Sequence, residues 1–352
     1  MKSKVVRAAT TALCQKRIFY KSSQKCYNFN ITTVSIYLAG IKFKIYVINF
    51  IGGKEMEHTT FHKNLNFNKL IILDCLPEND YQTARHLHEN LSDKGFGSGI
   101  SLLKVQDENT FREVLQEIRE MFNPELNVSF QPIIHIEAHG NSRSMELPDK
   151  SIIPWNDLAY NLRIINKLMG NQLITFIGTC HGYHFIYKNH TIKEFAPVYF
   201  CIAPLEEIPA CDIEHSALTF YENLFLTGDL TRSANLLDST KLYTYNSDYM
   251  FHRAFHEAMQ KNHRGKALRI RREALITEAI EIMGEDWKKM SPKDKRDYLK
   301  KARELLDVSL KSKESLRAEF EKFSIGYMGY IDGDVFEEIW KHMNHNKQGK
   351  IY

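Results

Sequence analysis

The 352-residue chain lacks the features that would assign it to the membrane or the secreted class at once. No stretch offers the ~18 uninterrupted apolar residues of a membrane-spanning helix, because Lys42 and Lys44 interrupt the most apolar segment, residues 31–52. No apolar core leads to a small-residue cleavage site, so an export signal is not indicated. We therefore expect no membrane span and a cytoplasmic protein.

Closely spaced cysteines are also missing. No pair has CxxC spacing, which argues against a zinc knuckle or a disulfide framework and favours a reducing compartment. The six cysteines are Cys14, Cys26, Cys75, Cys180, Cys201 and Cys211. We expect Cys75 and Cys201 to be buried as small apolar side chains. We expect neither a metal ion nor an organic cofactor.

A surplus of charge is absent as well. The chain carries 47 basic and 43 acidic residues, with a formal net charge of +4 and a pI near 8.5. Such a balance is typical of an ordinary solvated surface and does not indicate a basic surface that binds nucleic acid. No internal repeat occurs, and no linker rich in proline or glycine separates parts of the chain.

The first 55 residues resemble neither a domain nor a signal. One hypothesis is that translation begins at Met56, since residues 52–55 (GGKE) could be encoded by a purine-rich ribosome-binding sequence. The alternative is a genuine tail that touches a membrane or binds a partner. We treat residues 1–55 as a doubtful extension.

From Asn68 onward, apolar runs alternate with amphipathic segments. This alternation predicts an α/β fold in which helices cover both faces of a mainly parallel sheet. The expected strands are 69–75, 100–105, 133–138, 173–178 and 198–203, and the expected helices are 80–91, 109–122, 154–169 and 213–226, with a polar loop at 141–153. We expect an α/β domain over residues 56–249 and a helical, basic extension over 250–352.

Two of the expected strands end in reactive side chains. The run IIHIEAHG ends in His139 and Gly140, and the run ITFIGTC ends in Cys180. Because open α/β sheets place their sites at the carboxyl ends of parallel strands, neighbouring strands would hold His139 and Cys180 side by side. The imidazole can then accept the thiol proton and leave a strong nucleophile.

The backbone beside these two residues could also take part in the chemistry. Gly140 lets a substrate approach closely, and its N–H together with that of Cys180 could form an oxyanion hole. His181 and His184 lie nearer to Cys180 in sequence. We prefer His139 as the base because it comes from a separate element, whereas His181 would point away on a strand-like backbone.

A hydrophobic strand ending in His-Gly, followed later by a hydrophobic strand ending in Cys, resembles the cysteine proteases that include caspases, legumain, gingipains, separase and CHAT proteins. Residues 199–237, with Phe220-Tyr221, Leu224 and Gly228, are similar to the CHAT branch. The resemblance covers about residues 68–245. It implies a caspase-like three-layer α/β/α sandwich and endopeptidase activity, in a family associated with prokaryotic defence and cell death.

Other residues receive roles around this pair. His135 and Glu137 share a strand face with His139, so we expect them to support it through hydrogen bonds. The resemblance places a substrate pocket at Glu207, Ala210 and Asp212, where the Val-x-Asp turn of many relatives is replaced by Ile208-Pro209-Ala210. A basic substrate side chain would lack its usual counter-charge there, so we expect an uncharged or apolar residue before the scissile bond.

Three alternatives remain open. The same fold could be a catalytically inactive scaffold. His135, His139, Cys180 and His184 could bind zinc, although ligands on separate strands are unusual for such sites.

The third alternative concerns residues 284–302 (GEDWKKMSPKDKRDYLKKA), which locally resemble the second helix of an HMG-box DNA-binding domain. No helix carrying the rest of such a box is evident before it. An amphipathic helix with Trp287, Tyr298 and Leu299 packed inward explains the pattern equally well. We therefore expect no nucleic-acid partner; the expected partners are a protein substrate and a regulatory or sensor protein bound by the C-terminal helices.

Overall fold

A computed structural model describes residues 16–22, 25–38, 41–49, 67–123, 130–189, 191–262 and 265–345. The proposed translation start at Met56 lies outside these ranges. In the N-terminal part, β1 (Lys16–Ser22), β2 (Lys25–Leu38) and β3 (Ile41–Asn49) form an antiparallel sheet in the order β1-β2-β3.

The described residues divide into two compact units, which we describe separately. The α/β unit comprises those within Thr59–Phe251 together with Lys322–Ile331, and the second unit contains the helices of His252–Glu321 and Asp332–Tyr352. In the described part of the chain, no helix is both long and apolar enough to cross a membrane.

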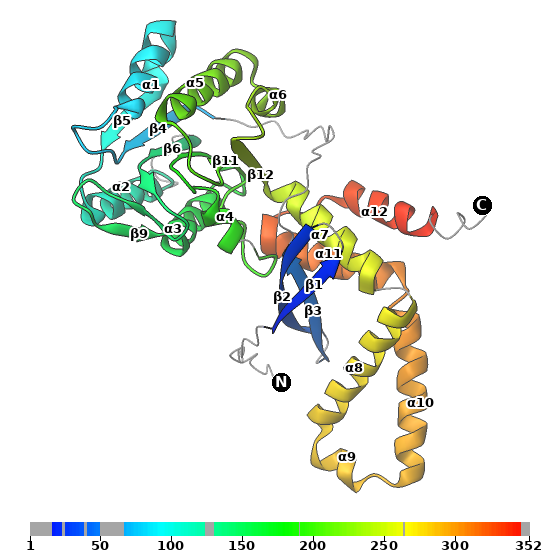
Figure 1. Ribbon diagram of the computed structural model, residues 1–352. Coiled ribbons are helices and arrows are strands. Elements are labelled where there is room, and N and C mark those ends of the chain that lie inside the picture. The colour runs from blue at the N-terminus through cyan, green and yellow to red at the C-terminus, as the bar shows by residue number, and fades with distance from the viewer. Residues whose placement is uncertain are drawn as a thin grey trace. The chain divides into compact units, whose positions relative to one another are not determined.

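The α/β unit is built on a six-stranded sheet in the order β12-β11-β10-β6-β4-β5 (Figure 1). The strands are β4 (Lys69–Asp74), β5 (Ile100–Lys104), β6 (Pro132–Glu137), β10 (Ile174–Gly178), β11 (Phe200–Pro204) and β12 (Leu242–Asn246). All neighbours run parallel except β12, which is antiparallel to β11. The expectation of a mainly parallel sheet is confirmed.

Helices cover both faces of this sheet (Figure 1). One face packs against α1 (Thr83–Leu91), α5 (Ala210–Thr227) and α6 (Leu230–Asn235), and the other against α2 (Glu108–Glu120), α3 (Trp155–Leu168) and α4 (His184–Asn189). Successive strand residues serve opposite cores: Ile71 and Leu73 face one, Leu70 and Ile72 the other. The unit therefore has three layers.

Local signals in the sequence explain most helix boundaries. The carboxylate of Asp107 accepts a hydrogen bond from the Thr110 N–H and caps the start of α2. Gly228 ends α5 in the left-handed conformation, with φ of +68°, where a side chain would be strained. Helix α3 begins at Trp155, directly after Pro154, and the helix expected from residue 80 begins at Thr83.

Some elements were not expected from the sequence. The polar loop at 141–153 contains β8 (Ser144–Glu146), which pairs with β7 (His139–Gly140) and with β9 (Ile152–Pro154) in a small antiparallel sheet. Strands of two or three residues are too short to show an alternating pattern, so they could not be predicted from the sequence. Strand β12 and helix α4 were also not assigned, whereas the short helix that the family resemblance implies around Ala234 is present as α6.

The end of α11 (Lys313–Met328) belongs to the α/β unit. The hydroxyl groups of Tyr327 and Tyr245 are 2.5 Å apart, and the Tyr327 ring stacks on Phe251. The Ala196 N–H donates to the Tyr327 carbonyl at 2.9 Å. The β12 edge of the sheet is thus covered by a segment distant in sequence.

The remaining elements are helical. They are α7 (Ser247–Asn262), α8 (Gly265–Met283), α9 (Glu285–Lys289), α10 (Pro292–Ser309) and α12 (Gly333–His345). Helices α8 and α10 lie side by side, joined by ion pairs from Arg272 to Asp307 and from Arg303 to Glu273 (Figure 1). The helical C-terminal region is confirmed.

Candidate active site

Neighbouring strands β6 and β10 place His139 and Cys180 at the same edge of the sheet. Their parallel register pairs Glu137 with Gly178, and each reactive residue follows its paired residue by two positions. Extended chains that leave a sheet in register stay adjacent for a further residue or two. The two strand ends singled out by the sequence are therefore brought together.

The contact between the two strand ends is close at Gly140. A Cβ atom added to Gly140 would lie 2.4 Å from Cγ2 of Thr179 and 2.6 Å from the carbonyl oxygen of Cys180. Real carbon atoms cannot approach so closely, so only glycine allows β7 to pack on the turn that carries the thiol. This packing gives Gly140 a structural role beyond the expected approach of substrate.

A surface hollow of about 420 Å³ opens beside the thiol. Gly140, Cys180, Glu207, Ile208 and Pro209 line it. The Cys180 side chain is half-buried, with Sγ 3.7 Å from the Ile208 carbonyl oxygen. Within the described residues the Cys180 N–H has no backbone acceptor, so it can still donate a hydrogen bond to a ligand.

The turn that carries Cys180 is anchored to the end of β11. The N–H of His181 donates to the Glu206 carbonyl at 3.2 Å, and the N–H of Tyr183 donates to the Pro204 carbonyl at 2.9 Å. His181 adopts a left-handed φ of +60°, so the strand-like backbone assumed for it was wrong. Its Nδ1 lies 3.1 Å from the Leu205 carbonyl oxygen, to which it donates a hydrogen bond.

His139 is exposed and has one bonded neighbour in the described chain. Its Nε2 lies 2.5 Å from Oδ2 of Asp80, a residue in the turn after β4. Asp80 was not expected from the sequence. The signal that could have found it is an acidic side chain just beyond the carboxyl end of a third buried strand, at the same edge of the sheet.

His135 and Glu137 are brought together, but they contact each other and not His139. His135 Nε2 lies 2.8 Å from Oε1 of Glu137, and His135 Nδ1 lies 3.1 Å from the Tyr221 hydroxyl. The Thr83 hydroxyl donates to Oε2 of Glu137 at 3.0 Å. Both strand residues are essentially fully buried, so the network fixes β6 to α1 and α5 beneath the site.

Only one of the expected pocket acids is placed to meet a substrate. Glu207 lines the hollow, whereas the carboxylate of Asp212 is paired with Lys241 at 2.7 Å. Ala210 begins α5 and is exposed. The negative charge of Asp212 is therefore already compensated.

The other cysteines of the α/β unit differ sharply in accessibility. Cys75 and Cys201 are fully buried, as expected, while Cys211 is exposed. Burial raises the pKa of Cys75 far above its usual range and raises the pKa of Cys201 to about 12, the latter opposed by a hydrogen bond with Thr175. These two thiols stay protonated and are shielded from reagents.

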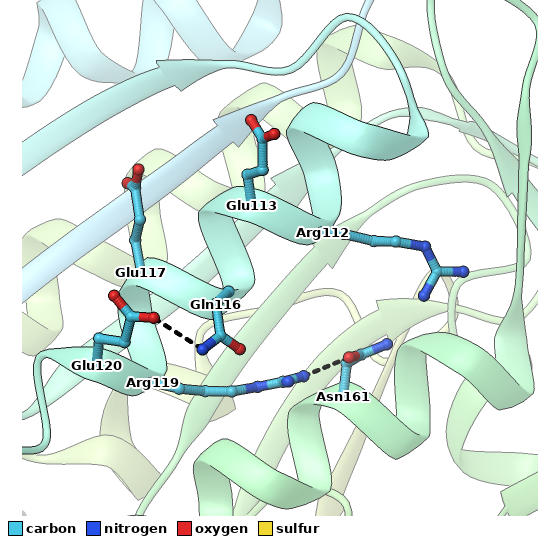
Figure 2. Close-up of a pocket in the computed structure, with 7 residues that line it drawn as sticks. All are labelled: Arg112, Glu113, Gln116, Glu117, Arg119, Glu120 and Asn161. Carbon is cyan, nitrogen blue, oxygen red and sulfur yellow. Dashed lines mark hydrogen bonds between the residues drawn. The ribbon is translucent and has the colours of Figure 1, made fainter.

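A second hollow, of about 480 Å³, lies between α2 and α3 (Figure 2). Figure 2 shows that Arg112, Glu113, Gln116, Glu117, Arg119 and Glu120 of α2 line it with Asn161 of α3, and that Arg119 bonds to Asn161. Its lining is polar and lacks a nucleophile beside a base. It offers no catalytic arrangement.

Among the residues that the structure describes, no three His, Cys, Asp or Glu side chains gather closely enough to hold a metal ion. His135 is engaged by Glu137 and Tyr221, and His139 by Asp80. The four residues considered as zinc ligands do not form a cluster.

Comparison with known protein families gives a match in the C-terminal part of the chain. A family model of the HMG-box domain matches residues 245–312, less than half of the chain. No curated protein matches the chain. The expectation of no nucleic-acid partner was wrong, because this match points to DNA binding.

Two assumptions caused that error. Residues 284–302 were compared with a single helix, whereas they span α9 and most of α10, and the matched region begins earlier, at Tyr245. The near-neutral charge of the whole chain also concealed a local excess of basic over acidic residues. Residues 245–312 hold 16 Lys and Arg against 11 Asp and Glu, an excess larger than the +4 of the whole chain.

One face of α10 carries three exposed basic side chains, with the acidic side chain of Asp297 beside them. Lys293, Arg296 and Lys300 are spaced three and four residues apart, so they project from the same side of the helix. All three are exposed, and none forms an ion pair within the described residues. On the opposite side Trp287 and Tyr298 are half-buried against each other.

Proposed function

We propose that the α/β unit is a caspase-like cysteine endopeptidase of the CHAT branch, with Cys180 as nucleophile and His139 as general base. The observation that supports the proposal is the register of β6 and β10, which brings the two strand ends to one edge of the sheet, where Gly140 and Cys180 line a hollow. The resemblance of the two strand ends supports the choice of protein as substrate and suggests a setting in prokaryotic defence or cell death. An inactive scaffold with the same fold is the alternative.

The reaction is an acyl transfer in two stages. The thiol proton of Cys180 moves to His139 as Sγ attacks the scissile carbonyl carbon. The resulting oxyanion accepts hydrogen bonds from the N–H groups of Cys180 and Gly140. When the carbon–nitrogen bond breaks, His139 returns the proton to the leaving amine, and water then hydrolyses the thioester with His139 again as base.

An activity-independent experiment separates the enzyme from the scaffold. Alkylation of Cys180 by iodoacetamide is followed by mass spectrometry of the peptide that contains it, in the wild type and in His139→Ala. We expect the imidazole to speed alkylation near pH 7, because only the thiolate reacts. Exposed Cys211 in the same molecule is the internal reference. Equal rates for Cys180 in both proteins would favour the scaffold.

We propose, as a second function, that residues 245–312 bind duplex DNA. The HMG-box match is the observation that favours it, and the basic face of α10 (Lys293, Arg296 and Lys300) supplies suitable charge. Reversing all three charges to glutamate should weaken binding. It should also reduce the slope of log K against log salt by about 3, at about 0.9 per phosphate contact.

A matched triple variant controls for net charge. Lys167→Glu, Lys193→Glu and Arg232→Glu change the same number of exposed charges in the α/β unit. Fluorescence anisotropy with a labelled duplex should show a loss for the α10 variant and little change for the control. Equal losses in both variants would mean that only overall charge matters, and no binding by the wild type would reject the function.

A further inference from the structure

We propose that Asp80 is a positioning residue of the cysteine site, which fixes the tautomer of His139 and stabilises its protonated form. This inference rests on the proposed function of His139 and Cys180 and extends it from two residues to three. Its starting point is the 2.5 Å contact between Oδ2 of Asp80 and Nε2 of His139.

The sheet topology explains how the three side chains meet. Strands β10, β6 and β4 are consecutive neighbours, and they lead at their carboxyl ends to Cys180, His139 and Asp80 respectively. The imidazole therefore follows the middle strand, between the strand that leads to the thiol and the strand that leads to the carboxylate. Three adjacent parallel strands form one line of groups at a single edge.

The turn that carries Asp80 is held in place by its own hydrogen bonds. The Asp80 N–H donates to the Pro77 carbonyl at 3.1 Å. The Gln82 side-chain amide donates to the carbonyl oxygens of both Pro77 and Asp80, at 2.7 and 3.0 Å. A fixed main chain lowers the entropic cost of holding a carboxylate against the imidazole, which distinguishes this contact from an ordinary surface ion pair.

The chemistry of the contact assigns the ring nitrogens. An ionised carboxylate can only accept hydrogen bonds, so Nε2 of His139 must carry the proton that it donates to Asp80. In the neutral imidazole Nδ1 is then the basic nitrogen, and it has no other partner within the described residues. The thiol proton of Cys180 moves to Nδ1, while Asp80 remains ionised and faces the resulting imidazolium.

Other charged groups near His139 largely cancel. Glu146 lies opposite His139 in the β7–β8 pair, and its carboxylate is bonded to Lys150 at 2.8 Å. Lys150 also interacts electrostatically with Asp80, and Glu137 is buried in its own network. Asp80 is thus the carboxylate that bears directly on the ring.

The test compares Asp80→Asn with a matched control, Glu78→Gln. Glu78 is an exposed acid in the same turn that contacts Arg85 and Lys104 but not His139. Alkylation of Cys180 by iodoacetamide is measured from about pH 5 to about pH 10 in the full chain, because the thiolate–imidazolium pair dominates only between its two titrations. Cys211 again serves as the reference.

We expect Asp80→Asn to slow alkylation of Cys180 about threefold to tenfold near pH 7, with rates that converge with the wild type near pH 10. The alkylation rate falls near pH 7 because fewer molecules hold an imidazolium beside the thiolate. At high pH the thiolate forms without the help of the imidazolium, so the rates converge. Glu78→Gln and the Cys211 rate should not change. Asp80→Glu should recover part of the loss.

Two results would overturn the role of Asp80: wild-type rates in Asp80→Asn near pH 7, or an equal loss at every pH, which indicates a distorted site. Either result leaves the Cys180–His139 pair standing if His139→Ala still slows the reaction. If His139→Ala has no effect, the proposed function fails, and the inference about Asp80 fails with it.

Discussion

Replacing Gly140 with alanine should separate His139 from Cys180 while leaving the α/β unit folded. The added Cβ would lie 2.4 Å from Thr179 Cγ2, which is more than ~1 Å inside the ~3.5–4.0 Å separation of carbon atoms in contact. The carbonyl oxygen of Cys180, at 2.6 Å, belongs to the main chain and cannot rotate away. Strand β7 must therefore move.

The expected magnitude follows from that movement. Overpacking of this kind costs about 1–3 kcal/mol, which lowers Tm by a few degrees in a domain of this size. A shift of about 1 Å at a catalytic group lowers its effect by up to about 100-fold. We expect alkylation of Cys180 near pH 7 to slow by about tenfold to 100-fold.

The control is Gly99→Ala in the same unit, where the nearest atom to the added Cβ is 3.9 Å away. Alkylation kinetics and thermal unfolding by circular dichroism are measured for both variants. Gly99→Ala should match the wild type in both. Fast alkylation of Cys180 in a folded Gly140→Ala protein would refute the argument that β7 sets the position of His139.

Three further substitutions test other parts of the account. Glu137→Ala leaves buried His135 and Thr83 without the carboxylate that they contact, and it should lower the free energy of unfolding in urea by about 3–5 kcal/mol. The control Glu108→Ala, which removes a surface ion pair, should lower it by less than about 0.5 kcal/mol. Similar losses in both variants would contradict a special role for the buried network. Tyr327→Phe removes one buried hydrogen bond to Tyr245 and should cost about 1 kcal/mol by the same assay; an unchanged value would show that the contact is not formed in solution. Asp212→Asn should leave the substrate preference in a peptide panel unchanged because Lys241 already compensates that charge; loss of a strong preference for Arg or Lys would give Asp212 the pocket role.

The long elements of the α/β unit could be predicted because their signals are local. Buried strands such as β4 appear as short apolar runs, and a helix such as α2 shows its cap and its apolar stripe within one stretch of sequence. His139 and Cys180 were found for the same reason, since each ends a recognisable strand. Their adjacency depended on one assumption, namely that the two strands are neighbours. The pairing of β6 with β10 satisfies it.

Features that depend on distant contacts could not be predicted. The Asp80–His139 contact joins residues separated by 59 positions, and the Tyr245–Tyr327 contact joins residues separated by 82. The backbone of His181 turns into the left-handed region because Leu205 and Glu206 hold it, which no local pattern records. The basic face of α10 was visible in the sequence, but averaging charge over the whole chain hid it.

We propose that Cys180 and His139 together cut peptide bonds. The most direct measurement is mass spectrometry of new amino termini in a complex protein mixture incubated with the wild type, Cys180→Ala or His139→Ala. We predict termini that appear with the wild type and with neither variant, sharing a common residue before the cut. The proposal would be contradicted if the wild type produced no termini beyond those seen with Cys180→Ala. It would also be contradicted if the new termini persisted with either variant.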